Sequence, residues 1–168
     1  RDHIRENAAA SVAVGLSTLD FDGRSIEQKK EQIEGCQMHC RLASEAGLPL
    51  MLEVGPEAGD IALALLKKYC TADAIIYLHK WAASTEVALA VLSAFPNAVV
   101  GFTGAVTFAK SKASRELAFD CPMDRLLIGT TAPFTHPVTS PPRPTNLQCH
   151  PGVIPSIAAK IAEVKGVA

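Results

Sequence analysis

The stretch Leu126-Leu127-Ile128-Gly129-Thr130-Thr131-Ala132-Pro133-Phe134 decides the fold of this chain. Three apolar residues lead into a polar turn and a proline, a pattern typical of a buried strand and its end. We expect this strand at residues 124–130, as the last of five apolar runs of strand length. Residues 133–151 follow, rich in proline and without periodicity, and we expect an ordered or functional loop there.

Strands and helices alternate upstream of this stretch. The four earlier strands are expected at residues 10–16, 48–54, 73–79 and 98–103. Ser25-x-x-Gln28 is a capping box that opens a charged, amphipathic helix, and Gly47 is well suited to end it. The other helices are expected at residues 58–69, 85–95 with Ser84 as N-cap, 111–119 and 152–164.

This order of elements predicts a parallel α/β fold, in which helices cover a sheet of nearly uninterrupted apolar strands. Two architectures fit the pattern: a doubly wound sandwich and a (β/α)8 barrel. A nucleotide-binding sandwich would need a glycine-rich turn after its first strand, and residues 15–18 (Gly-Leu-Ser-Thr) offer none. The pattern of elements alone leaves both architectures open.

Composition narrows the function classes. The 168 residues are 48% hydrophobic and 20% charged, which is ordinary for a globular protein, and we treat residues 1–168 as one domain. A net charge of −1 without a basic patch disfavours direct nucleic-acid binding. No apolar run approaches the ~18 residues of a membrane span. The chain begins at Arg1 without an apolar leader, so we expect a processed or shortened chain.

The five cysteines are odd in number and irregularly spaced. This usage indicates reduced thiols in an intracellular protein, of the cytosol or of an organelle matrix. Cys36-x-x-His39-Cys40 has the look of a metal cluster, because residues 36 and 40 share a face if the segment is helical. No second ligand pair has a suitable spacing, so buried apolar thiols are the preferred interpretation.

A series of motifs along the chain resembles those of the TatD-like metal-dependent deoxyribonucleases. The matches, in chain order, are residues 14–21 (VGLSTLDF) with iGEiGLDy, residues 28–49 with the helix Q...F..Ql.lA.e..lP, residues 50–53 (LMLE) with viiH, residues 77–84 (YLHKWAAS) with gvlHcFsGs, residues 101–108 (GFTGAVTF) with isftG.vtf, residues 124–133 with drLLIETDAP, and residues 144–146 (PTN) with kRNeP. Each motif is weak alone, but their order and spacing favour common ancestry.

The resemblance implies a (β/α)8 barrel with a metal site at the C-terminal ends of its strands. Because such a barrel typically needs ~250 residues, it implies here a partial or remodelled barrel without the first strands. The family's first strand carries a His-x-His pair of metal ligands, and no His-x-His occurs in this sequence.

The resemblance also implies that most of the family's metal ligands are replaced. The family's Glu becomes Leu16, the first of its two later His becomes Glu53, and its metal-binding Asp becomes Thr131. The second His is retained as His79, and Gly129 stands where the signature has its own Glu. Hard divalent ions need several oxygen or imidazole ligands at once, so we expect no catalytic residue and no metal, with Glu53 and His79 as residual candidates.

Structural roles are preferred for the remaining chemical side chains. Glu53 is expected to form an ion pair with Lys80 or His79, and His79 to be a buried, hydrogen-bonded ring. His136, in the proline-rich segment, is expected at the surface. Packing explains Trp81, which stands at the aromatic position of the family's motif.

Three hypotheses follow for the function. The preferred one is a catalytically inactive TatD-like pseudoenzyme, a structural or interaction subunit of a larger assembly. Protein partners would cover the open edges of the barrel, and nucleic acid would be bound only through that assembly. The alternative is a divergent deoxyribonuclease or phosphodiesterase that uses Mg²⁺, Mn²⁺ or Zn²⁺, with Glu53, His79 and His136 as ligands beside an upstream His-x-His pair. The third is an unrelated α/β domain.

Overall fold

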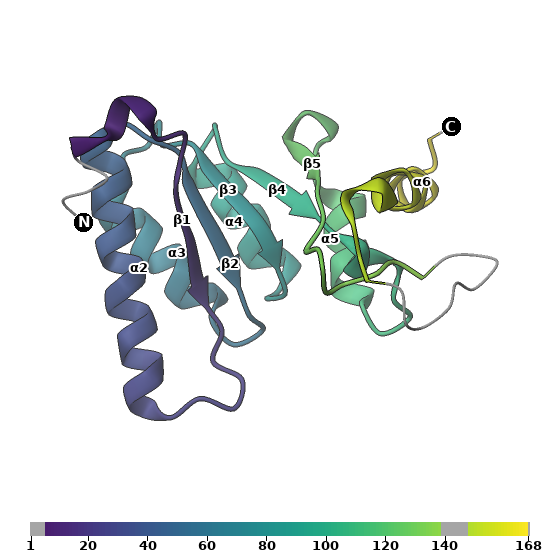
Figure 1. The fold of residues 1–168 in the computed structure, drawn as a ribbon, viewed down its shortest axis with the longest axis horizontal. Helices are drawn as coiled ribbons and strands as arrows, with labels where there is room; N and C mark the ends of the chain where they lie inside the picture. Colours follow the sequence, from purple (N-terminus) through teal and green to yellow (C-terminus); the bar gives the residue numbers. More distant parts are fainter. Residues whose placement is uncertain (1–5, 139–147, 168) are drawn as a thin grey trace. The chain divides into compact units, whose positions relative to one another are not determined.

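A computed structural model describes residues 6–138 and 148–167 (Figure 1). The chain divides into two compact units, residues 1–99 and residues 100–168, and each is described by itself. The motif at residues 144–146 and the middle of the proline-rich segment lie outside the described residues.

The first unit contains three strands and three long helices in alternation. Its strands are β1 (Val14–Leu19), β2 (Leu50–Val54) and β3 (Ile76–Trp81), and its helices are α2 (Ile26–Ala46), α3 (Gly59–Tyr69) and α4 (Thr85–Ala94). A short 3-10 turn, Ala8–Ala10, precedes β1. β1 pairs with β2 and β2 with β3, both in parallel. The predicted parallel α/β class is therefore confirmed in this unit.

The helices of the first unit gather on one face of its strands (Figure 1). α2 packs against β1 and α3, and α3 packs against α4. Alternate strand residues point into this layer and are buried, among them Leu50, Leu52 and Leu78. The intervening residues point to the opposite face, where Leu16 is 43% exposed and Glu53 is half-buried. Leu16 and Glu53, the candidates on β1 and β2, thus lie on the less covered face.

Local signals predicted the helix ends well. The Ser25 hydroxyl accepts from the Gln28 N–H at 3.3 Å while the Gln28 side chain accepts from the Ser25 N–H, which completes the capping box. Gly47 ends α2 with a φ of +64°, the left-handed conformation that glycine adopts without a Cβ penalty. Ser84 caps α4 through the Val87 N–H, and its carbonyl accepts from Trp81 Nε1 at 2.9 Å. Trp81 is buried, so the packing interpretation of its ring is confirmed.

The second unit contains β5 (Leu126–Ile128), α5 (Lys112–Asp120), α6 (Ile154–Lys165) and all of β4 (Val99–Phe102) except its first residue. β4 and β5 pair in parallel, and α5 packs against α6. The Lys165 ammonium donates to the carbonyls of Phe119 and Cys121, at 3.1 and 2.6 Å. These bonds satisfy carbonyls at the C-terminal end of α5, where a helix dipole favours a cation. Shorter 3-10 turns lie at Gly104–Thr107, Met123–Arg125 and Pro151–Val153.

All five strands differ from their predicted bounds; β2 and β4 are shorter by two residues each, and the other three are shifted or interrupted. The first begins four residues later than predicted and runs to Leu19, with a shift of register after Val14. The third begins at Ile76 rather than residue 73, because Ala74 closes a turn on Thr71 with a 3.0 Å hydrogen bond. The fifth loses its first two residues to the 3-10 turn at Met123–Arg125. Hydrophobic runs do not reveal these turns, since their backbone hydrogen bonds are not encoded by apolar periodicity.

Candidate functional site

The strand register of the first unit brings three polar residues into line. Thr18 of β1 pairs with Glu53 of β2, and Glu53 pairs with Lys80 of β3. The register of β2 and β3 shifts between Leu52 and Glu53, so Glu53 lies beside Lys80 rather than His79. Because these positions are near the C-terminal ends of parallel strands, this edge corresponds to where the family's site is expected.

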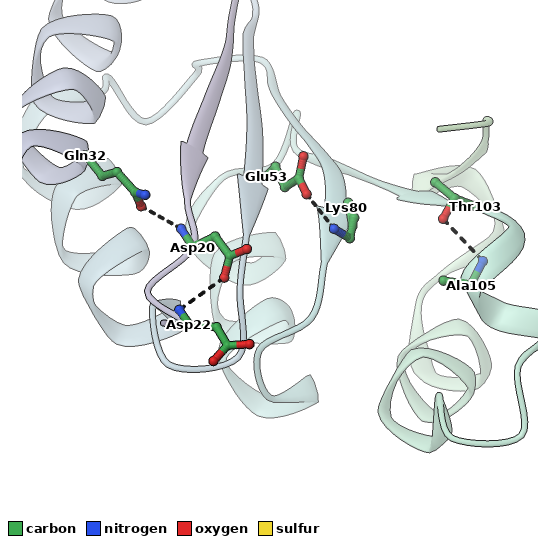
Figure 2. Close-up of polar contacts among 7 residues, drawn as sticks. All are labelled: Asp20, Asp22, Gln32, Glu53, Lys80, Thr103 and Ala105. Carbon is green, nitrogen blue, oxygen red and sulfur yellow. Dashed lines mark hydrogen bonds and ion pairs between the residues drawn. The ribbon is translucent and has the colours of Figure 1, made fainter. Parts of the chain in front are cut away.

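Glu53 and Lys80 form a short ion pair on this edge (Figure 2). The Lys80 ammonium donates to Glu53 Oε1 at 2.6 Å, and the side chains are 41% and 20% exposed respectively. The predicted pairing of Glu53 is thus found with Lys80. A cation binding at Glu53 would have to compete with this ammonium for the same carboxylate.

His79 hydrogen-bonds to Tyr77 on the same strand. Its Nδ1 lies 3.1 Å from the Tyr77 hydroxyl, and the two rings meet edge to face with centroids 5.4 Å apart. The ring is half-buried, less than predicted. Burial lowers the pKa of His79. The negative charge of Glu53 raises this pKa, and the positive charge of Lys80 lowers it. Burial also raises the pKa of Tyr77. Both side chains are therefore favoured in their neutral forms.

The sequence pattern missed Tyr77 as a partner of His79. Residues two apart on a strand point to the same face, so Tyr77-x-His79 within an expected strand was a usable signal. The pattern also missed the hydrogen bond from the Asp20 N–H to Gln32 Oε1 at 2.8 Å, which ties the end of β1 to α2 (Figure 2). Nothing local in the sequence joins residues twelve apart across a turn and a helix.

The two replaced ligand positions that carry no charge differ in their surroundings. Leu16 is an exposed aliphatic side chain without a lone pair for a cation. Thr131 follows β5 in the second unit, and its Oγ1 is buried without a hydrogen-bond partner among the described residues. Neither replacement provides the charged oxygen that a divalent cation prefers.

The predicted surface position of His136 is wrong. The ring is half-buried; its Nδ1 lies 2.9 Å from the Pro137 carbonyl, and its Nε2 is buried without a partner in the described part of the chain. Gly104 explains this packing, since a Cβ there would lie 2.5 Å from the Thr135 carbonyl. The glycine lets the segment around His136 lie directly on the turn after β4, whose Thr103 hydroxyl accepts from the Ala105 N–H (Figure 2).

The donor groups in the described part of the chain do not by themselves make up a divalent-metal site. Across residues 6–138 and 148–167, no three His, Cys, Asp or Glu side chains are arranged to hold an ion, and this includes Cys36, His39 and Cys40. The Glu53 carboxylate forms an ion pair with Lys80. His79 would contribute one imidazole, whose Nδ1 already forms a hydrogen bond with the Tyr77 hydroxyl. Hard divalent ions take several oxygen ligands at once, which these two groups do not supply.

Comparison with known proteins identifies the relatives of this chain. The family model described as TatD related DNase matches residues 2–168. The chain is 30% identical over 155 residues to the 3'-5' RNA nuclease TATDN2 of Homo sapiens, covering 92% of this chain and 20% of that protein. It is 31% identical over 156 residues to the 3'-5' ssDNA/RNA exonuclease TatD of Erwinia billingiae, covering 92% and 58%.

Solved structures settle which architecture the elements belong to. The TatD homolog YJJV from Escherichia coli superposes with a TM-score of 0.81 at 21% identity, over 97% of this chain and 60% of that one. A TatD family hydrolase from Entamoeba histolytica gives 0.76 at 18%, over 98% and 60%. The chain thus spans less than two thirds of the length of these relatives and shares the fold of part of their barrel. It belongs to the TatD-related DNase family.

Proposed function

We propose that this chain is a TatD-like pseudoenzyme, which does not hydrolyse phosphodiesters by itself and serves as a structural or interaction subunit of a larger assembly. The observation that carries the proposal is the Glu53–Lys80 ion pair at a position where the family has a metal-binding His. A lysine bound to that position supplies the positive charge that a metal would otherwise bring. Leu16 and Thr131 add no charged ligand.

The open face of the first unit supports a role in assembly. Leu16 is 43% exposed, and half-buried Met51 and Tyr77 point to the same face of neighbouring strands. Apolar side chains held on a rigid sheet beside polar ones are a common basis for protein contacts. A protein partner on this face would bury them.

The names of the relatives favour a second candidate, a divergent metal-dependent nuclease. The similar proteins are called RNA nuclease, ssDNA/RNA exonuclease and, in Escherichia coli, metal-dependent hydrolase. In this candidate, Glu53, His79 and His136 would act with ligands that this chain does not supply. Lys80 would have to release Glu53, and a bound metal would activate water against the phosphodiester.

A paired activity and binding assay separates the candidates. The purified chain is incubated with 3'-labelled single-stranded DNA and RNA in Mg²⁺, Mn²⁺ or Zn²⁺, and binding of each metal is measured by calorimetry. We expect no hydrolysis above the protein-free control and no metal binding tighter than about 1 mM. Hydrolysis that needs metal and is lost in Glu53→Gln and His79→Ala, but kept in Glu57→Gln, would overturn the pseudoenzyme proposal. Glu57 is a matched control because its carboxylate is exposed and pairs loosely with Lys29 at 3.8 Å.

Native mass spectrometry of the endogenous protein tests the assembly part of the proposal. We expect a complex heavier than the chain whose composition does not change on chelation. A monomer that carries one or two chelatable divalent ions would instead support the nuclease.

A further inference from the structure

Three thiols of the first unit form a cluster that the proposed function does not use. Cys36 and Cys40 lie one turn apart on α2, and Cys70 is the C-cap residue of α3. α2 packs against α3, and Ser44, one turn after Cys40, donates to the carbonyl of Tyr69, the neighbour of Cys70, at 3.0 Å. This packing places the thiol of Cys40 between the other two, and Ser17 of β1 interacts with Cys36. The cluster therefore lies in the helix layer, reaching from β1 to the end of α3.

Solvent reaches the cluster mainly at Cys70. Cys36 and Cys40 are almost completely buried, whereas Cys70 is half-exposed. Cys70 lines a pocket of about 230 Å³ together with Ser44, Leu48, Thr71 and Asp73. This volume exceeds that of several water molecules, at ~30 Å³ each, so a small oxidant fits. A reagent that enters the pocket meets Cys70, whereas Cys36 and Cys40 are not among the residues that line it.

The position of the protons within the cluster favours Cys70 as the reactive thiol. A thiol has one S–H, so Cys40 donates to one neighbour at a time. The interaction with Cys40 lowers the pKa of Cys70. Cys36 and Cys70 together raise the pKa of Cys40. Interaction with Cys40 also lowers the pKa of Cys36, but Cys36 is buried and does not line the pocket. Cys70 is therefore the accessible nucleophile of the cluster, and Cys40 keeps its proton.

We propose that Cys70 and Cys40 are a peroxide-reactive thiol pair that closes a disulfide between α3 and α2. The Cys70 thiolate attacks one oxygen of a hydroperoxide, the O–O bond breaks, and Cys70 becomes a sulfenic acid while hydroxide or alkoxide leaves and takes up a proton. The Cys40 sulfur then attacks the Cys70 sulfur; the S–O bond breaks and water leaves with the Cys40 proton. Two electrons pass from the thiols to the peroxide, and a dithiol reductant reverses the change.

The test is peptide mapping of the intact chain after limited oxidation. The folded chain is treated with stoichiometric hydrogen peroxide, remaining thiols are alkylated, and the product is mapped by mass spectrometry. We expect a product about 2 Da lighter, with one Cys40–Cys70 disulfide that dithiothreitol removes. Oxidation spread over all five cysteines, or a disulfide that excludes Cys70, would overturn the proposal, and neither result depends on nuclease activity.

Variants test which thiol reacts first. Cys70→Ser, at the half-exposed position, should slow thiol loss at least about tenfold. Cys149→Ser, a buried cysteine of the second unit, is the matched control and should leave the rate unchanged. Equal rates in the two variants would contradict the assignment of Cys70 as the reactive thiol. Oxidation of the wild type in urea gives a further check, because the selectivity for Cys70 should disappear once the pocket is lost.

Discussion

The two compact units differ in the partners of the residues that the resemblance aligns with family metal ligands. In residues 1–99, Glu53, which the resemblance aligns with a family His, is neutralised by Lys80 at 2.6 Å. In residues 100–168, Thr131 is the residue that the resemblance aligns with the family Asp, and its hydroxyl is buried with no partner in the described part of the chain. One position has thus gained a new interaction, and the other has kept a polar atom without one.

This difference follows from the cost of burying each kind of group. A half-buried carboxylate without a partner costs several kcal/mol or must be protonated, so a replacement that keeps charge requires a new ion-pair partner. A neutral hydroxyl left unpaired costs only ~1–3 kcal/mol, which a folded domain can tolerate. A charged side chain at such a position is therefore more strongly constrained than a neutral one.

The largest expected effect concerns the strands that carry these positions. Leu78 of β3 is fully buried, whereas Leu127 of β5 is 46% exposed. Leu78→Ala should lower the free energy of unfolding by ~2–5 kcal/mol, through lost burial and a residual cavity. Leu127→Ala should cost below ~1 kcal/mol because little apolar area leaves the interior. Urea unfolding followed by circular dichroism measures both; equal losses would show that β5 is packed as firmly as β3.

Removing the unpaired hydroxyl tests the second unit directly. Thr131→Val replaces Oγ1 with a methyl group of nearly equal size, so it should stabilise the fold by up to ~1 kcal/mol. Thr130→Val is the neighbouring control, since Thr130 has no buried unpaired hydroxyl. Thermal unfolding compares the two variants with the wild type. A clear loss of stability in Thr131→Val would mean that its hydroxyl has a partner that matters.

How far the sequence predicts the structure also differs between elements. Helix α2 was predictable from both ends, because Ser25, Gln28 and Gly47 act through hydrogen bonds and φ angles within a few residues. The ends of β1 and β3 were not, because a register shift after Val14 and a turn at residues 71–74 depend on pairing with another segment. Apolar periodicity identifies a strand but does not fix its register.

The candidate site is also predictable from the sequence only in part. The pairing of Glu53 was expected, but the choice of Lys80 over His79 depends on the shift of register between β2 and β3. The half-buried position of His136 depends on Gly104, 32 residues away, whose missing side chain admits the Thr135 carbonyl. Contacts of this kind arise only when the chain has folded, so residue type and spacing do not predict them.

A double-mutant cycle measures what the new ion pair contributes. Glu53→Gln, Lys80→Met and the double variant should give a coupling of about 0.5–1 kcal/mol, small because Lys80 is partly solvated. Lys112 and Glu116, at 3.2 Å on the exposed face of α5, are the matched control and should couple by ~0.3 kcal/mol. High salt should weaken the control pair more. A coupling at Glu53 no larger than at Glu116 would remove the contrast between the two replaced positions.

The smallest expected effect is a pH dependence within the first unit. Burial lowers the pKa of His79 and of His39 below the value of 6.5 that they have in the unfolded chain. At pH values between the pKa of the folded state and 6.5, the unfolded state binds more protons than the folded state. The contribution of these histidines to stability is therefore fully present above pH 6.5 and is lost as the pH falls through this window. The loss should be modest because both rings are half-buried.

Substitution assigns this loss to particular rings. Urea midpoints at pH 7.5 and 5.5 should differ in the wild type, and the difference should shrink in His79→Gln and again in His39→Gln/His79→Gln. His150→Gln, at an exposed histidine of the second unit, should leave the difference unchanged. Glu53 favours the charged imidazole of His79, so Glu53→Gln should lower its pKa further and widen the window. An unchanged window in Glu53→Gln would mean that Lys80 screens the carboxylate fully from the ring, and a narrower window would contradict the direction of the Glu53 effect on His79.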